Sequence, residues 1–261
     1  MHLLVFDSGI GGLGVVREIR HLQPHARISY LADNGFFPYG EKPDAVLLPH
    51  IVKLIGEAVE ILKPDAVVVA CNTASTIALG ALRAAYAVPF IGCVPPIKPA
   101  AAASRTRVIG ILATAATVRR TYLQNLIEQF APDCEIHSLG APTLAELAEQ
   151  KFRGQAVDVA SAVAPLFSQP GAGRIDAVAL GCTHYTFLHA EFAALYPGVK
   201  WFDPALPVAR RTLAVTQGFS TAAGLDAQVA WFTAALPDLD IMRPRLAEFG
   251  FCEIRQGACF S

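Results

Sequence analysis

The chain has 261 residues, of which 53% are hydrophobic and 16% are charged, and its formal net charge is −1. This length suits one large domain or two of ordinary size, and the apolar content excludes a disordered chain. The charge balance argues against a nucleic-acid partner. No apolar run reaches the roughly 18 residues of a membrane span, and residues 1–10 lack the basic start of a signal peptide, so we expect a cytoplasmic protein with no membrane partner.

The first predicted unit is a strand at residues 2–7, followed by a glycine-rich turn at 9–14 and a helix. Asp7 and Ser8 stand at the carboxyl end of this strand. The turn matches the GxGxxG spacing of a dinucleotide site, and Asp33 lies near the expected ribose-binding distance. An acid aimed at a phosphate would repel it. A turn that presents Asp7 and Ser8 is therefore favoured over a nucleotide site.

A loop at residues 33–40 follows the second predicted strand, at 27–32. It ends in Pro-Tyr-Gly, which is typical of a turn. Loops after strands often carry functional groups on a rigid scaffold. Tyr39 is therefore a candidate ligand-contacting hydroxyl, and an ordinary turn residue is the alternative.

The segment DAVVVACNTAST, residues 65–76, contains a buried-strand pattern that leads directly into Cys71 and then into a helix. The carboxyl end of a strand is where ligands bind in open α/β sheets. A helix start also lowers the pKa of a thiol. A buried structural cysteine is the alternative, but Asn72 and Thr73 beside Cys71 favour a site.

A proline-rich stretch at residues 95–99 follows a short predicted strand at 88–94. We predict that it does not continue a helix or a central strand, and that the chain crosses there to a second domain. The strand and helix pattern then begins again. Further strands are predicted at 107–113, 135–139, 175–180 and 200–202, and helices at 15–22, 46–62, 74–85, 118–130, 144–152, 157–167, 187–195, 208–217 and 226–236.

The second half repeats the layout of the first half. DAVALGCTHYTF, from residue 176, parallels the segment around Cys71 and places Cys182 111 positions later (182 − 71), while Asp7 and Thr114 lie 107 positions apart (114 − 7). We predict an α/β fold with two pseudo-symmetric parallel-sheet lobes and the active site in the cleft between them. The first lobe is expected at 1–95 plus about 209–261, and the second at 96–208.

Paired cysteines on facing strand ends suggest one thiolate that removes a proton and one thiol that delivers a proton to the opposite face of the same carbon. This is racemisation or epimerisation by two bases. Asp7 and His184 are nearby groups that could manage protons, although His184 could instead be a core imidazole. The other cysteines, Cys93, Cys134, Cys252 and Cys259, lack metal-type spacing, so we expect free thiols and no metal site.

Six motifs carry a resemblance to the glutamate racemases, within the aspartate/glutamate racemase superfamily. They are FDSGIGGL at 6–13, PYG at 38–40, ACNTAS at 70–75, VPPIKPA at 94–100, ILATAAT at 111–117 and GCTHY at 181–185. The resemblance spans about residues 3–210. It assigns the glycine-rich turn to a catalytic Asp-Ser pair and not to a nucleotide.

The resemblance implies cofactor-independent interconversion of L- and D-glutamate, which supplies D-glutamate for peptidoglycan. It implies that Cys71 deprotonates the D-enantiomer with help from Asp7, and that Cys182 deprotonates the L-enantiomer with help from His184. Glu149 matches the family's acidic position near His184. The implied substrate contacts are Asp7, Ser8, Pro38, Tyr39, Gly40, Asn72, Thr73, Thr114, Thr117, Thr183 and His184.

The chain departs from the family pattern at two places that border the cleft. Residues 33–37 replace a DTARF-like run, and Thr186 stands where a proline normally follows GCTHY. The expected partner is glutamate, with a homodimer as a further expectation. Two alternatives stay open: a racemase of a related substrate such as aspartate or a hydantoin, and a non-catalytic two-lobed binding protein.

Overall fold

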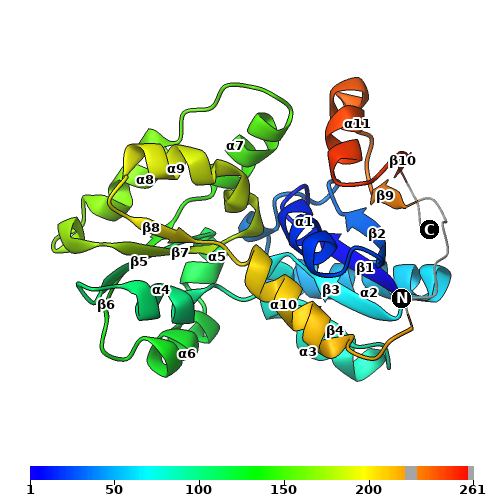
Figure 1. The fold of residues 1–261 in the computed structure, drawn as a ribbon, viewed down its shortest axis with the longest axis horizontal. Coiled ribbons are helices and arrows are strands. Elements are labelled where there is room, and N and C mark those ends of the chain that lie inside the picture. The colour runs from blue at the N-terminus through cyan, green and yellow to red at the C-terminus, as the bar shows by residue number, and fades with distance from the viewer. Residues whose placement is uncertain (221–227, 258–261) are drawn as a thin grey trace.

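A computed structural model of the protein describes residues 1–220 and 228–257 and contains two α/β lobes side by side (Figure 1). Cys259 lies outside the described residues. Each lobe is built on a sheet in which every strand pair is parallel. The predicted class, two parallel-sheet α/β lobes, is confirmed.

Four neighbouring strands of the first sheet have the same order as the four strands of the second sheet. The first sheet runs β10 (Glu253–Gln256), β9 (Val229–Phe232), β2 (Arg27–Ala32), β1 (His2–Asp7), β3 (Ala66–Val69) and β4 (Phe90–Gly92). The second sheet runs β6 (Glu135–Gly140), β5 (Val108–Ala113), β7 (Ala177–Gly181) and β8 (Lys200–Phe202).

Helices cover both faces of each sheet. On the first sheet, one face packs against α1 (Leu13–Leu22), α10 (Ala205–Val215) and α11 (Leu239–Glu248), and the other against α2 (Asp44–Leu62) and α3 (Asn72–Ala85). On the second sheet, one face packs against α7 (Thr143–Phe152), α8 (Ala160–Phe167) and α9 (His189–Leu195), and the other against α4 (Ile97–Ala103) and α6 (Thr121–Phe130). The shorter elements are α5 (Ala115–Val118) and the 3-10 turns η1 (Tyr39–Glu41), η2 (Ala172–Arg174) and η3 (Thr183–Leu188).

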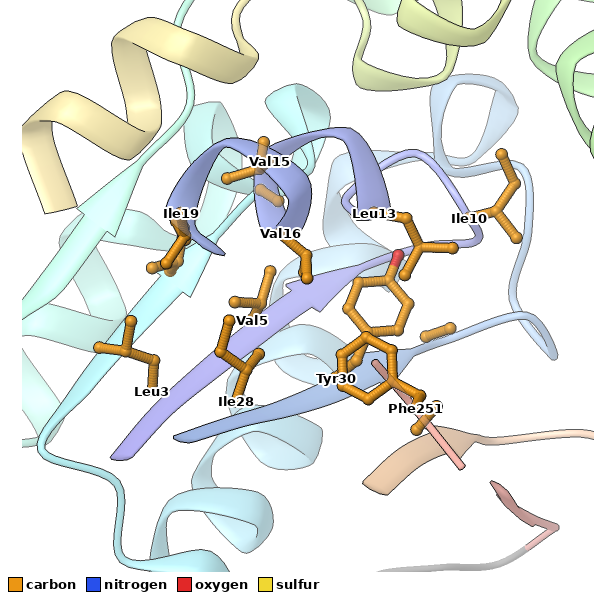
Figure 2. Packing of buried hydrophobic residues seen from close by; sticks show 14 of the residues in the cluster. Leu3, Val5, Ile10, Leu13, Val15, Val16, Ile19, Ile28, Tyr30 and Phe251 are labelled. Carbon is orange, nitrogen blue, oxygen red and sulfur yellow. The ribbon is translucent and has the colours of Figure 1, made fainter. Parts of the chain in front are cut away.

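Covering both faces explains why the strands read as continuous apolar runs instead of alternating patterns. Leu3 and Val5 of β1 face α1, whereas Leu4 and Phe6 pack on the α2 and α3 side. Figure 2 shows Val5 and neighbouring residues of α1 and β2 meeting in the first of these two cores. Complete burial of a side chain of this size contributes about 1.5–3 kcal/mol, so these runs fix the strand positions.

The topology brings the predicted site residues together. In the first sheet β1 lies between β2 and β3, so the strand order reverses at β1. In the second sheet β5 lies between β6 and β7 in the same way. Ligands bind at such a reversal of strand order, beyond the carboxyl ends of the strands. Asp7 and Cys71 stand at the reversal in the first sheet, and Thr114 and Cys182 at the reversal in the second.

An aromatic cluster connects the two lobes behind the cleft. Phe152 ends α7, Phe187 lies in η3, and Phe249 follows α11 of the first lobe. Their ring centroids are 5.5 to 6.4 Å apart. The contact ties the η3 turn after Cys182 to the first lobe.

The predicted helix at 226–236 is wrong in its described part, because β9 occupies residues Val229–Phe232 and pairs with β2 and β10. Four buried residues, VAWF, are too few for their spacing to separate strand from helix. Neither α11 nor β10, in the last part of the chain, was predicted.

The proline-rich stretch is also corrected, because α4 begins at Ile97 and contains Pro99. A proline in the first turn of a helix removes an N–H that has no intrahelical partner, so it is tolerated there. The predicted helix at 118–130 is divided into α5 and α6, and the first part of the predicted helix at 187–195 is the 3-10 turn η3. In the part of the chain that the structure describes, no helix has the length and apolar character to cross a membrane.

Candidate active site

Both paired cysteines line one small cavity where the two sheets face each other. Its volume is about 20 Å³, whereas one water molecule needs roughly 10–15 Å³. The cavity is therefore closed around little more than one water molecule, and as it stands it is too small for an amino acid. The residues around the cavity are Ser8, Phe37, Pro38, Tyr39, Gly40, Cys71, Asn72, Thr73, Thr114, Ala145, Cys182 and His184.

Four other predicted residues lie directly behind this lining and hydrogen-bond within the site: Asp7, Thr117, Glu149 and Thr183. The fold therefore brings every predicted site residue to one place. Within residues 1–220 and 228–257, no three His, Cys, Asp or Glu side chains form a group that could hold a metal ion.

Asp7 is completely buried between the two halves of the site. Its carboxylate accepts hydrogen bonds from the Thr183 hydroxyl at 2.9 Å and from the Gly9 amide at 3.1 Å. Its Oδ1 also lies 3.9 Å from Nδ1 of His184. Burial raises the pKa of Asp7, and the neighbouring His184 and Thr183 only partly offset that effect.

Cys71 caps the start of α3, as the sequence predicts, but its thiolate is not favoured in the closed site. The pKa of Cys71 is raised well above its ordinary value, chiefly by burial and next by the charge of Asp7. The Ala74 amide at the helix start lowers this pKa, but by less. The expectation of a depressed thiol pKa at this position is therefore wrong for the closed state. Oγ of Ser8 lies 3.9 Å from the Cys71 sulfur.

Cys182 has different neighbours. Its sulfur lies 4.0 Å from Nδ1 of His184, and the opposite ring nitrogen, Nε2, lies 3.2 Å from Oε1 of Glu149. Burial alone would lower the pKa of His184, but Cys182, Glu149 and Asp7 together raise it well above its ordinary value. Burial raises the pKa of Glu149, but the hydrogen bond and the charge of His184 lower it by more, so this pKa lies below its ordinary value. His184 and Glu149 thus pair in a buried contact beside the Cys182 sulfur, and a part for His184 in proton transfer stays a prediction.

The glycine-rich turn makes room for this buried pair. A Cβ atom at Gly11 would lie 2.5 Å from Nδ1 of His184, and one at Gly9 would collide with Glu149. The Ile10 amide donates to Oε1 of Glu149 at 2.8 Å. The space that a phosphate would need is filled by two catalytic candidates, so the nucleotide interpretation of the turn is wrong.

A polar wall from both lobes closes another side of the cavity. The Asn72 amide donates to the Thr117 hydroxyl at 3.4 Å, and the Thr117 and Thr114 hydroxyls are 2.9 Å apart. Oδ1 of Asn72 is buried and has no hydrogen-bond partner. A buried acceptor without a partner is costly, and this one is available to an ammonium or amide donor in the cavity.

Tyr39 contributes differently from the prediction. Its side chain is 2% exposed, and its hydroxyl donates to the Asp33 carboxylate. The hydroxyl hydrogen is therefore already used within the protein. Gly40 is pressed against the second lobe, because a Cβ there would lie 2.7 Å from Cβ of Thr114.

Three residues that contribute to the site were not predicted as site residues. The Phe37 ring packs 5.2 Å from the His184 ring, and Ala145 lines the cavity. Arg153, which directly follows α7, donates to Oε2 of Glu149 at 3.2 Å. The i, i+4 spacing of Glu149 and Arg153 was visible in the sequence, whereas the positions of Phe37 and Ala145 depend on the cleft.

The comparison with protein families matches residues 15–212 to the model described as Asp/Glu/Hydantoin racemase. A relative named glutamate racemase, from Granulibacter bethesdensis, is 46% identical over 97% of this chain and 95% of its own length.

Two solved structures have a similar fold over nearly the whole chain. Escherichia coli glutamate racemase, in complex with L-glutamate and activator UDP-MurNAc-ala, has a TM-score of 0.91 at 38% identity and covers 98% of both chains. Glutamate racemase isoform RacE1 from Bacillus anthracis has a TM-score of 0.76 at 28% identity, covering 97% of this chain and 95% of its own.

Proposed function

The chain belongs to the family of Asp/Glu/hydantoin racemases, and we propose that it interconverts L- and D-glutamate by proton transfer at Cys71 and Cys182. The observation that carries this proposal is that two thiols from equivalent strand ends line one closed cavity. The reaction needs no cofactor in this proposal, and its product D-glutamate would serve peptidoglycan synthesis.

In the proposed mechanism, the Cys71 thiolate removes the α-proton of D-glutamate, and the Cys182 thiol delivers a proton to the opposite face of the same carbon. The reverse direction exchanges the two roles. In the forward direction Cys71 becomes a thiol and Cys182 becomes a thiolate, while the α-carbon loses one proton and gains another, so the step balances. The α-proton of an amino acid is a very weak acid, and the transition state therefore needs fixed charges around the carbanion.

The surroundings of each thiol support this assignment. Cys71 is neutral in the closed site because of burial and Asp7, and the α-ammonium of a bound amino acid would favour its thiolate by Coulomb attraction. The charged His184 would stabilise the Cys182 thiolate and help that sulfur to recover a proton. Asp7 and His184 are thus the proposed assisting groups, and Glu149 holds His184 in its charged form.

The polar lining suits a small zwitterion with a second carboxylate. The unpartnered Oδ1 of Asn72 could accept from the substrate ammonium, and the Thr114 and Thr117 hydroxyls could donate to a carboxylate. The remaining proposed contacts are Asp7, Ser8, Pro38, Tyr39, Gly40, Thr73, Thr183 and His184. Binding requires the lobes, proposed at 1–95 plus about 209–261 and at 96–208, to separate and close again.

The test is proton exchange in deuterium oxide, with purified protein, L-glutamate and L-aspartate in separate reactions, and no pyridoxal phosphate. We expect α-deuterium and D-enantiomer to appear in glutamate, with much slower or no exchange in aspartate. Faster exchange in aspartate would assign the related-substrate alternative. Binding of glutamate without exchange would assign the binding-protein alternative.

A further inference from the structure

A buried carboxylate outside the catalytic set anchors the loop that forms one wall of the cavity. Asp33 follows β2 and is 1% exposed. Its Oδ2 accepts from the Tyr39 hydroxyl and lies 2.6 Å from Nε2 of His50, in the middle of α2. Its Oδ1 accepts from the Thr233 hydroxyl at 2.7 Å, just beyond the end of β9. A carboxylate is buried at this depth only when such partners compensate for lost hydration.

Two further contacts fix the loop on either side of Asp33. The Gly35 amide donates to Oγ1 of Thr233 at 3.1 Å, so this hydroxyl both donates and accepts. Asn34 and the backbone of Ala234 exchange two hydrogen bonds of 2.9 and 3.1 Å. The C-terminal strand segment thus supports a loop that lies 200 residues earlier in the chain.

Aromatic packing holds the loop on the His50 side of Asp33, at a position where the sequence departs from the family pattern. Phe36 stacks on the ring of His50, with centroids 3.8 Å apart and planes at 13°. Nζ of Lys42 lies 5.8 Å from the centroid of the Phe36 ring. The residue at this position therefore completes the packing of His50 against Asp33.

Movement of this anchor would be transmitted directly to the cavity. The Tyr39 hydroxyl is tied to Asp33, and the next residue, Gly40, is in contact with Thr114 of the other lobe. Both Tyr39 and Gly40 line the cavity. A shift of the Tyr39 ring would therefore change where this wall meets a bound substrate and how the lobes close on it.

We propose that Asp33 is a positioning residue for substrate binding, which acts through Tyr39 and is itself held by His50 and Thr233. The proposal rests on the proposed function, because its measurement is glutamate turnover. Loss of the anchor weakens binding of both enantiomers alike, since the wall is common to them, and leaves the two proton-transfer groups in place.

The closing experiment compares Thr233→Val with Thr233→Ser. Valine has a similar shape but removes the hydroxyl, whereas serine keeps it. We expect Thr233→Val to raise KM for L- and D-glutamate about tenfold and to lower kcat less than about threefold, as loss of a hydrogen bond to a charged group implies. Thr233→Ser should restore the KM of the unmodified protein.

A second pair separates positioning from general stability. Asp33→Asn removes the charged anchor, and Asp176→Asn removes a carboxylate of the second lobe that accepts from Ser104 at 2.6 Å and from the Arg105 amide at 2.8 Å. Both variants should lower the unfolding temperature, but only Asp33→Asn should raise KM.

The outcomes are distinguishable. If the unmodified protein exchanges the α-proton of glutamate but Thr233→Val keeps its KM, the positioning role is overturned and the proposed function stands. An equal rise in KM for Asp176→Asn and Asp33→Asn would also overturn it. Absence of exchange in the unmodified protein overturns the proposed function and this inference with it.

Discussion

The two halves of the site occupy equivalent strand ends but surround their thiols with different chemistry. Cys71 faces a hydroxyl, Ser8, and is influenced by the buried carboxylate of Asp7. Cys182 faces His184, which is paired with Glu149. The repeated fold therefore places a thiol at the equivalent strand end of each lobe but surrounds the two thiols with different partners.

This difference has a chemical consequence. Burial and, second, the charge of Asp7 raise the pKa of Cys71 and disfavour its thiolate, so that thiol carries its proton until a positive group arrives. On the other side, the neighbour of Cys182 is His184, whose pKa is raised well above its ordinary value by Cys182, Glu149 and Asp7. Under the proposed assignment, the substrate ammonium activates one half and the protein itself supplies the cation for the other.

The largest expected effect comes from removing either thiol. Cys71→Ser and Cys182→Ser should each reduce racemisation by a factor of about 10³ or more, because a serine hydroxyl is a far weaker acid and base here. Each variant should keep some α-deuterium exchange in the enantiomer that its remaining thiol faces. Cys71→Ser, which retains Cys182, should exchange L-glutamate, and Cys182→Ser, which retains Cys71, should exchange D-glutamate. Proton NMR in deuterium oxide, together with chiral chromatography, measures both quantities.

Full racemisation by both serine variants would contradict the two-thiol mechanism. Cys93 provides the matched control, because it is a buried cysteine of the same lobe as Cys71 that lies outside the lining of the catalytic cavity. Cys93→Ser should retain racemisation.

The next largest effect is expected from a change on the Cys182 side of the site. His184→Asn removes the cation beside Cys182 and should lower kcat about 10²-fold. Starting from D-glutamate, deprotonation by Cys71 continues while protonation from Cys182 slows, so exchange without inversion should increase relative to inversion. Starting from L-glutamate, exchange and inversion should fall together.

Ser8→Ala is the mirror-image change on the Cys71 side. The 3.9 Å contact between Ser8 and Cys71 is long, so we expect a loss of less than about tenfold, with the pattern of the two enantiomers reversed. An identical exchange pattern in both variants would contradict the proposed division of roles.

A smaller effect is expected in the pH profile of Glu149→Gln. Glu149 contributes to the raised pKa of His184. Without that carboxylate, His184 loses its proton at a lower pH, so the alkaline limb of kcat should move to lower pH. Activity below the limb should fall about tenfold or less.

Glu146→Gln is the control for that profile, since Glu146 lies on the same helix, is exposed, and does not contact His184 among the described interactions. Its alkaline limb should stay in place. If both variants shift the limb equally, the effect is a general change in charge and not the loss of the His184 partner.

The sequence predicted the lobes because buried parallel strands leave strong local signals. The runs before Asp7, Cys71, Thr114 and Cys182 are apolar, and their similar spacings, 107 and 111 positions, indicated the repeat. The strand at Val229–Phe232 left no comparable signal. It is short, and it joins the sheet by pairing with β2, which lies in a distant part of the chain.

The two thiols were predicted for a similar reason, whereas other site residues, including Glu149, were predicted from the resemblance to the glutamate racemases, and the pKa shifts were not predicted. Polar residues after a buried strand identify a strand end, which located both thiols. The pKa of Cys71 depends on burial and on Asp7 across the turn, and no local pattern reports either. Likewise, the Asp33 to Thr233 hydrogen bond joins residues 200 positions apart, which only the folded chain brings together.

The smallest expected effect concerns closure, which both halves share. Gly40→Ala places a methyl group 2.7 Å from Cβ of Thr114, where neither backbone can yield easily. The lobes should then close less completely, and KM should rise about threefold to tenfold with a smaller change in kcat. Gly80→Ala is the matched control, because nothing lies within 4 Å of a Cβ at that position in α3, and the helix should gain about 0.5–1 kcal/mol of stability. Steady-state kinetics with both enantiomers and thermal unfolding measure the pair. An unchanged KM in Gly40→Ala would mean that the contact between Gly40 and Thr114 is not made in the substrate-bound enzyme.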